Sequence, residues 1–162
     1  MMKQIILMIA LTFLCACGNA GSQVPEPVPV PSEKEETPMI EPAETASLRM
    51  FVNNEEIAVQ WEDNDTVREL TDLAKDHEIV IQMSMYGGWE QVGPLGTSLS
   101  SQNSRITTQP GDIVLYSGNQ IVVFYGPNTW EYTMLGHMEN MTEDELTNLL
   151  GNSDITLTIC YK

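Results

Sequence analysis

The sequence predicts a mainly β domain, a small closed antiparallel β-barrel with two short helices, in the later part of a 162-residue chain. Three observations predict it. Short runs of alternating or β-branched residues recur from residue 48 to the end of the sequence. Turn residues separate these runs at short intervals. Only two segments have helical periodicity, and closure into a barrel would remove the exposed edges of so many short strands.

The chain begins with the features of an exported bacterial lipoprotein. An apolar run follows Lys3 and ends at Leu14-Cys15-Ala16-Cys17, as in a secretory signal with a charged start and a small residue before the cleavage point. The run is shorter than the about 20 residues that cross a bilayer. We therefore expect residues 1–16 to be a removed signal peptide and Cys17 to carry lipid such as palmitate. The protein would then be anchored in the cell envelope, facing away from the cytoplasm, and in the outer membrane if two membranes are present.

Residues 17–47 are predicted to be a disordered linker that begins at the acylated cysteine. Prolines alternate between residues 24 and 31 and favour extended polyproline II. The glutamates that follow repel one another and keep the segment open. We expect this segment to be a spacer for a domain over residues 48–162.

Charge and cysteine content limit the partners. Only 7 basic residues stand against 23 acidic ones, so nucleic acid is not an expected partner. Anionic lipid would repel the chain, and membrane attachment must come from the lipid on Cys17.

Cys160 is the one cysteine of the domain. A buried apolar role is more frequent for such a residue than a reactive thiol. We expect no metal, because the glycine and the closing glutamate that a calcium loop requires are not in register with residues 62–65. We also expect no cofactor, because no glycine-rich loop of the sequence has the helix and Lys that cradle phosphate.

The domain is expected to begin with a hairpin over residues 48–61. Two strand-like runs lie at residues 48–52 and 56–61. The pair Asn53-Asn54 between them is typical of a tight hairpin turn. A helix should follow from residue 66 to residue 74, where Thr66 and Glu69 form a capping-box pattern.

Residues 78–85 alternate between apolar and polar side chains, as a half-buried strand does. Residues 86–103 are rich in Gly and Ser and have no clear period. We interpret them as a long loop, and such loops are often functional.

A second hairpin is expected from residues 113–116 and 121–125, after a turn at residues 109–112. Residues 130–135 continue the β pattern. A helix should start at the capping pattern of Thr142 and Glu145 and end before Gly151. Residues 155–159 form the last predicted strand.

Several segments of this domain resemble the bacterial cyclophilin-like proteins. They are residues 86–93 (YGGWEQVG), 110–116 (PGDIVLY), 118–126 (GNQIVVFYG) and 130–136 (WEYTMLG). The order of predicted elements over residues 48–162 also fits. The resemblance implies a small closed β-barrel with two helices. It implies no reaction, because the Phe-His-Arg and Gln-Gly-Gly-Asp motifs of true peptidyl-prolyl isomerases are absent from this sequence. Met134 and His137 stand where the family pattern has basic residues.

The resemblance and the many aromatic and thioether side chains predict a ligand groove between the loop 86–103 and the strand around Phe124 and Tyr132. Aromatic and Met side chains suit an extended apolar ligand, although about half of them must face the core because strands alternate. The residues expected to line the groove are Met83, Tyr86, Trp89, Glu90, Phe124, Trp130, Tyr132 and His137.

Two functions follow as alternatives. The favoured one is a non-enzymatic binding module of the cell envelope that holds a proline-containing peptide segment or a small ligand. The alternative is a weak peptidyl-prolyl cis-trans isomerase, which must lower a barrier of about 18–20 kcal/mol with a cation or donor near the prolyl nitrogen. Arg105 is the candidate cation, with Gln82 and Gln91 as hydrogen-bond partners. A solvated loop residue is the simpler interpretation of Arg105.

Overall fold

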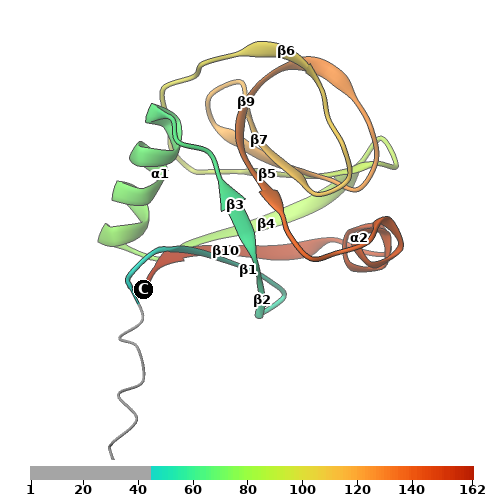
Figure 1. Ribbon diagram of the computed structural model, residues 1–162, viewed down its shortest axis with the longest axis horizontal. Coiled ribbons are helices and arrows are strands. Elements are labelled where there is room, and N and C mark those ends of the chain that lie inside the picture. The colour runs from blue at the N-terminus through green and yellow to red at the C-terminus, as the bar shows by residue number, and fades with distance from the viewer. Residues whose placement is uncertain (1–44) are drawn as a thin grey trace, which may run out of the picture. The chain divides into compact units, whose positions relative to one another are not determined.

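A computed structural model describes residues 45–162 (Figure 1). The predicted signal peptide, Cys17 and most of the predicted linker lie outside the described residues. The described chain is mainly β, a nearly closed antiparallel barrel with two helices, which confirms the predicted fold class. Ser47, expected at the end of the linker, exchanges two backbone hydrogen bonds of 2.7 and 3.1 Å with Lys162 and so extends the sheet by one residue.

The strands form one antiparallel path in the order β2-β1-β10-β4-β5-β8-β7-β9-β3, and β6 pairs with β9 beside it. The elements in chain order are β1 (Leu48–Val52), β2 (Glu55–Ile57), β3 (Val59–Trp61), α1 (Asp65–Asp76), β4 (Ile79–Tyr86), β5 (Glu90–Pro94), β6 (Ser104–Thr107), β7 (Asp112–Tyr116), β8 (Gln120–Phe124), β9 (Thr129–Met138), α2 (Glu143–Leu150) and β10 (Ile155–Tyr161).

The first predicted hairpin forms, but it is shorter than expected. Asn53 and Asn54 have φ values of 50° and 71°, the left-handed backbone that a tight hairpin turn requires. The hairpin partner of β1 is β2 alone, and the other edge of β1 pairs with β10. The expectation that residues 59–61 extend this hairpin is wrong, because β3 pairs with β9 at the other end of the sheet. The Trp61 indole N–H donates to the Leu48 carbonyl at 2.9 Å and so joins β3 to β1.

The first helix has a different cap from the predicted one. The Asn64 side chain accepts from the backbone N–H of Val67 at 2.9 Å and caps α1. Thr66 instead donates to the carbonyl of Ser100 at 2.6 Å, and the Glu69 carboxylate accepts from the N–H of Ser100 at 2.8 Å. The predicted capping box is therefore wrong: both side chains tie α1 to the segment between β5 and β6.

The second helix confirms its sequence signals. Thr142 and Glu145 form the reciprocal capping box of α2, and Gly151 is the C-cap residue. These signals are local, because the hydrogen bonds of both side chains join Thr142 and Glu145 to each other.

The segment predicted as one long loop contains a strand and precedes another. Gly87 and Gly88, with φ values of 64° and 84°, turn the chain from β4 into β5, and β6 follows at Ser104. Gly93 interrupts the alternation of apolar and polar side chains in β5, so the sequence pattern does not reveal this strand. A Cβ at this position would lie 2.5 Å from a methyl carbon of Ile81, so the close approach of β4 and β5 requires a residue without a side chain.

The buried side chains lie on two faces of the strands β7 and β8. One face, with Ile113, Leu115, Ile121 and Val123, joins the main core between the sheet and both helices. Side chains of the other face form a smaller group that we call the second cluster. Its buried members are Val114, Val122, Phe124 and Tyr132.

Candidate functional site

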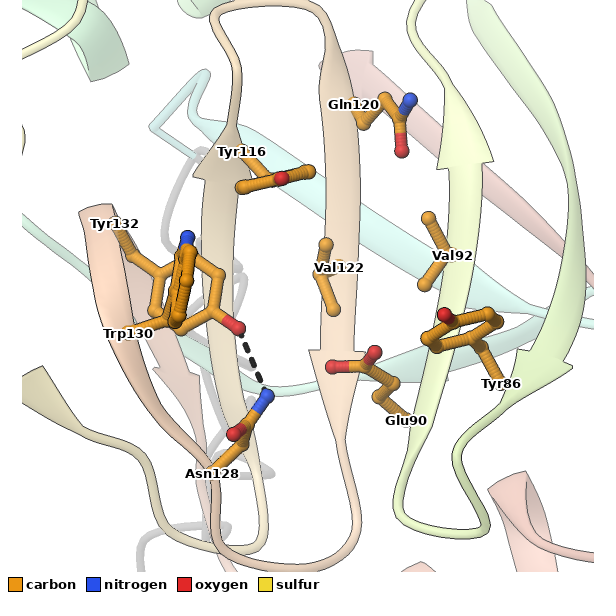
Figure 2. Close-up of a pocket in the computed structure, with 9 residues that line it drawn as sticks. All are labelled: Tyr86, Glu90, Val92, Tyr116, Gln120, Val122, Asn128, Trp130 and Tyr132. Carbon is orange, nitrogen blue, oxygen red and sulfur yellow. Dashed lines mark hydrogen bonds between the residues drawn. The ribbon is translucent and has the colours of Figure 1, made fainter.

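A cavity of about 410 Å³ opens above the second cluster (Figure 2). We call it the aromatic pocket. Side chains from the end of β4 and from β5, β7, β8 and β9 converge on it, together with one residue that precedes β9. The lining residues are Tyr86, Glu90, Val92, Tyr116, Gln120, Val122, Asn128, Trp130 and Tyr132.

The register of the strands places these side chains on one face. Tyr86 is opposite Glu90 on β4 and β5, Val92 is opposite Val122 on β5 and β8, and Gln120 is opposite Tyr116 on β8 and β7. Directly opposed residues of an antiparallel pair share a face, and neighbours in sequence take the other. The pairing of these four strands therefore places six of the nine lining residues on one face, and β9 with the residue before it supplies the other three.

Glu90 is the unusual group of the pocket. Its side chain is only 6% exposed, and its Oε2 atom is buried without a hydrogen-bond partner among the described residues. Figure 2 shows its carboxyl group pointing toward the middle of the pocket. Burial raises the pKa of Glu90 above its ordinary value, and the nearby Asn128 amide opposes this shift. A buried carboxylate oxygen without a partner is costly, so a ligand that supplied a donor would relieve that cost.

Asn128 is a fixed donor at the same end of the pocket. Its backbone N–H donates to the Thr108 hydroxyl at 3.0 Å, and its side-chain oxygen accepts from the N–H of Thr129 at 2.8 Å. The side-chain Nδ2 is thereby directed at the pocket, where it donates to the Tyr132 hydroxyl at 3.0 Å (Figure 2).

Aromatic rings form the walls. Tyr132 is buried and packs edge-on against Tyr116 and Phe124, with ring centroids 6.0 and 5.6 Å apart. Tyr86 and Trp130 are 69% and 54% exposed at opposite sides of the opening (Figure 2). Burial, followed by the nearby charge of Glu90, raises the pKa of Tyr132. The pocket thus combines exposed apolar rings with a deep carboxyl group.

Trp89 supports the pocket from outside. A Cβ at Gly87 would lie 2.6 Å from a Trp89 ring atom, so the indole packs directly on the turn between β4 and β5. The Trp89 carbonyl accepts from the N–H groups of Tyr125 and Gly126 at 2.9 and 3.1 Å. These contacts fix the turn that carries Tyr86 on one side and Glu90 on the other.

The structure brings together part of the predicted groove: Tyr86, Glu90, Trp130 and Tyr132 line the pocket. Met83 does not line it, because the inward positions of β4 belong to the main core. Phe124 is fully buried beneath Tyr132 in the second cluster.

His137 lies away from the pocket, near the C-terminal end of β9. Its Nδ1 is 2.8 Å from the Oδ1 atom of Asp112. Asp112 is buried, and its other carboxylate oxygen, Oδ2, accepts from the N–H of Gln109. This arrangement ties β9 to the start of β7, and the groove predicted from sequence does not extend to His137.

The residues proposed for the isomerase alternative also lie elsewhere. Arg105 is opposite Glu131 on β6 and β9, between the pairs that hold Tyr132 and Trp130, and so faces away from the pocket. Gln82 is exposed on β4 beside Thr156. Gln91 is buried on the opposite face of β5, where its amide donates to the carbonyls of Leu150 and Ser153 at 2.6 and 2.7 Å.

Sequence reasoning missed the remaining lining residues, which are Val92, Tyr116, Gln120, Val122 and Asn128. The sequence signal that could have identified some of them is the two-residue alternation of side chains along a β-strand. It links Glu90 to Val92 and Gln120 to Val122 once residues 90–94 are recognised as a strand.

Fold and site together define a small antiparallel barrel domain with an open, aromatic-walled pocket on one sheet face. The model of the cyclophilin-like family matches residues 50–160, and the chain therefore belongs to the cyclophilin-like family. This confirms the resemblance noted from the sequence. No curated protein and no solved structure matches the chain. Within residues 45–162, neither helix has the length and apolar character needed to cross a membrane.

Proposed function

We propose that this protein is a lipid-anchored, non-enzymatic binding protein of the cell envelope, and that its ligand occupies the aromatic pocket. One observation carries the proposal: a preformed cavity of about 410 Å³ has an exposed aromatic rim and a buried carboxyl oxygen, Oε2 of Glu90, that has no hydrogen-bond partner within residues 45–162. Small-molecule sites are typically about 300–1,000 Å³, largely apolar, with a few placed polar groups. The pocket fits that description, with Glu90, Gln120 and Asn128 as its acidic and amide groups.

Binding is favoured over proline isomerisation by the position of the cationic candidate. Arg105 faces away from the pocket, and the Asn128 amide already donates to Tyr132. The isomerase hypothesis stays a prediction. A proline-isomerisation assay on a peptide panel tests it, and robust catalysis that disappears in Arg105→Ala would replace the binding proposal.

The binding proposal is tested by titrating the purified protein with a panel of short peptides and small amines, followed by two-dimensional NMR. We expect saturable shifts at residues of β5 and β8, and a loss of affinity of about tenfold in Trp130→Ala or Tyr86→Ala, because exposed aromatic anchors dominate binding energy. Met85→Ala is the matched control. Met85 precedes Tyr86 and is also exposed, at 43%, but is not among the lining residues. Equal effects of all three variants, or shifts confined to other elements, would refute the site.

The anchor requires a separate test, because Cys17 lies outside the described residues. The motivation is the Leu14-Cys15-Ala16-Cys17 sequence after an apolar run. Radiolabelled palmitate should enter the wild-type protein and be lost in Cys17→Ser. A wild-type protein recovered unacylated in the medium would contradict the anchor and leave the pocket proposal unaffected.

A further inference from the structure

The side chains of the aromatic pocket have an unusual combination of chemistry. Four of the nine lining residues are aromatic, one is acidic, and none is Lys, Arg or His. Tyr86 stands on one side of the opening, Trp130 and Tyr132 stand on the other, and the Glu90 carboxyl group lies between them (Figure 2). The pocket therefore presents a carboxyl group between aromatic rings, and the rest of its lining is two valines and the amides of Gln120 and Asn128.

Aromatic faces attract cations through the ring quadrupole, and several rings around one site are the usual way to hold an ammonium group. A purely apolar ligand would gain from the rings alone. It would leave the Oε2 atom of Glu90, on a side chain only 6% exposed, still without a partner. A neutral donor could supply that partner, but it would gain little from the rings as π systems. A cationic nitrogen that carries a hydrogen can both interact with the aromatic rings and donate a hydrogen bond to the Oε2 atom.

We propose that the ligand carries an organic ammonium group, which sits against the Glu90 carboxylate between Tyr86 and the pair Trp130 and Tyr132. This inference rests on the proposed binding function and deepens it by naming the chemistry of the ligand. The formal net charge of the chain, −16 at pH 7, would also favour the approach of a cation. The pocket is open at its rim, so the ammonium group can belong to a free amine or to a Lys side chain of a peptide.

The test uses matched pairs of probes that differ in charge and hardly in shape. Choline is compared with 3,3-dimethylbutan-1-ol, its neutral isostere. The peptide Ala-Lys-Ala-Ala is compared with the same peptide carrying norleucine in place of Lys. We expect the charged member of at least one pair to bind about tenfold or more tightly than the neutral member. Preference within the choline pair identifies a free amine as the source, and preference within the peptide pair identifies a Lys side chain.

Glu90→Gln removes the charge and keeps the side-chain size. It should remove most of the preference for the cation, while the affinity for the neutral isostere stays within a factor of about two. Glu131→Gln is the matched control. Glu131 is an exposed acid of β9 that lies between Trp130 and Tyr132 in sequence and does not line the pocket. It makes the same charge change in the same region, and it should leave the preference intact.

A pH series adds a second readout. The titratable side chains around Glu90 are tyrosines: Tyr86 from β4, Tyr116 from β7, Tyr132 from β9 and the adjacent Tyr125. Glu90 is the one carboxyl group among the lining residues, and burial raises the pKa of Tyr125 and Tyr132, so we assign a change of affinity at lower pH to Glu90. Affinity for the cation should rise as pH increases through the pKa of Glu90, whereas affinity for the neutral isostere should not, and Glu90→Gln should abolish the rise.

Two failures are distinguishable. If the neutral members bind in the pocket as tightly as the charged ones, the ammonium inference is wrong and the binding function stands. If no probe of either kind shifts residues of the pocket, both are overturned. An equal loss of preference in Glu90→Gln and Glu131→Gln would show that general surface charge attracts the cation, which also overturns the assignment to Glu90.

Discussion

The two faces of strands β7 and β8 differ in how completely their side chains are packed. The face of β7 and β8 toward the main core packs against side chains from both helices and from β1, β4 and β10, and its residues are fully buried. The opposite face buries only the second cluster, and above it the side chains leave a cavity with a carboxyl group in it. The first face is packed for stability. The second retains polar and exposed aromatic groups that lower the stability of the fold, and such a loss of stability is typical of functional sites.

The largest expected difference between the faces lies in neighbouring residues of β7. Leu115 is fully buried in the main core, whereas Tyr116 lines the pocket. Leu115→Ala should lower the free energy of unfolding by about 2–5 kcal/mol, because it leaves a cavity in a sealed core. Tyr116→Ala loses mainly its edge contact with Tyr132 and should cost about 1 kcal/mol. Urea unfolding measures both free energies, provided that the dependence on urea concentration is the same as in the wild type. Equal losses of stability in the two variants would show that the two faces are packed alike.

An intermediate effect is expected at Gln91, which faces away from the pocket. Gln91→Ala would leave the carbonyls of Leu150 and Ser153 without their donor, at a cost of about 1–3 kcal/mol. Gln82→Ala, at an exposed position of β4, is the control and should change stability by less than about 0.5 kcal/mol. Thermal unfolding of the two variants compares them, and a Gln91 variant as stable as the control would contradict this role.

The smallest effect has the opposite sign. Because burial raises the pKa of Glu90 from its ordinary value of 4.5, the folded state binds more protons than the unfolded state between the two pKa values. Stability therefore falls as pH rises through that interval and stays lowered above it. Glu90→Gln lacks this penalty and should be more stable than the wild type at pH 7, by about 1 kcal/mol, with little difference below pH 4.5.

Denaturant unfolding of both proteins across this pH range checks the prediction. If Glu90→Gln loses stability at pH 7, then the carboxylate is satisfied in the folded protein, and the contrast between the faces is weaker than we infer.

Features with local signals were predictable from the sequence. The turn at Asn53-Asn54, the hairpin of β7 and β8, and the capping box of α2 each depend on residues close together in the chain. Thr66 and Glu69 have an equally good local pattern. The structure uses both to bind Ser100, about thirty residues away, and that partner cannot be read from the helix itself.

The site was only partly predictable for the same reason. Tyr86 and Trp130 stand out as aromatic residues, whereas Val122 and Gln120 become pocket residues only through the pairing of β5 with β8. Glu90 and Gln91 are adjacent and both buried. Their different roles follow from the face each occupies, which was hidden as long as residues 86–103 were interpreted as a loop.

The path of the chain through Ala58 has a consequence for association between molecules. This one residue separates β2 from β3, which are the two ends of the sheet and are only three residues long each. Aggregation by strand addition needs a long, flat free edge as a template. Here both end strands are short, and β2 also carries the exposed acids Glu55 and Glu56, of which Glu56 pairs with Arg49. An incoming strand would meet few free backbone groups at these two ends, so strand addition is disfavoured there.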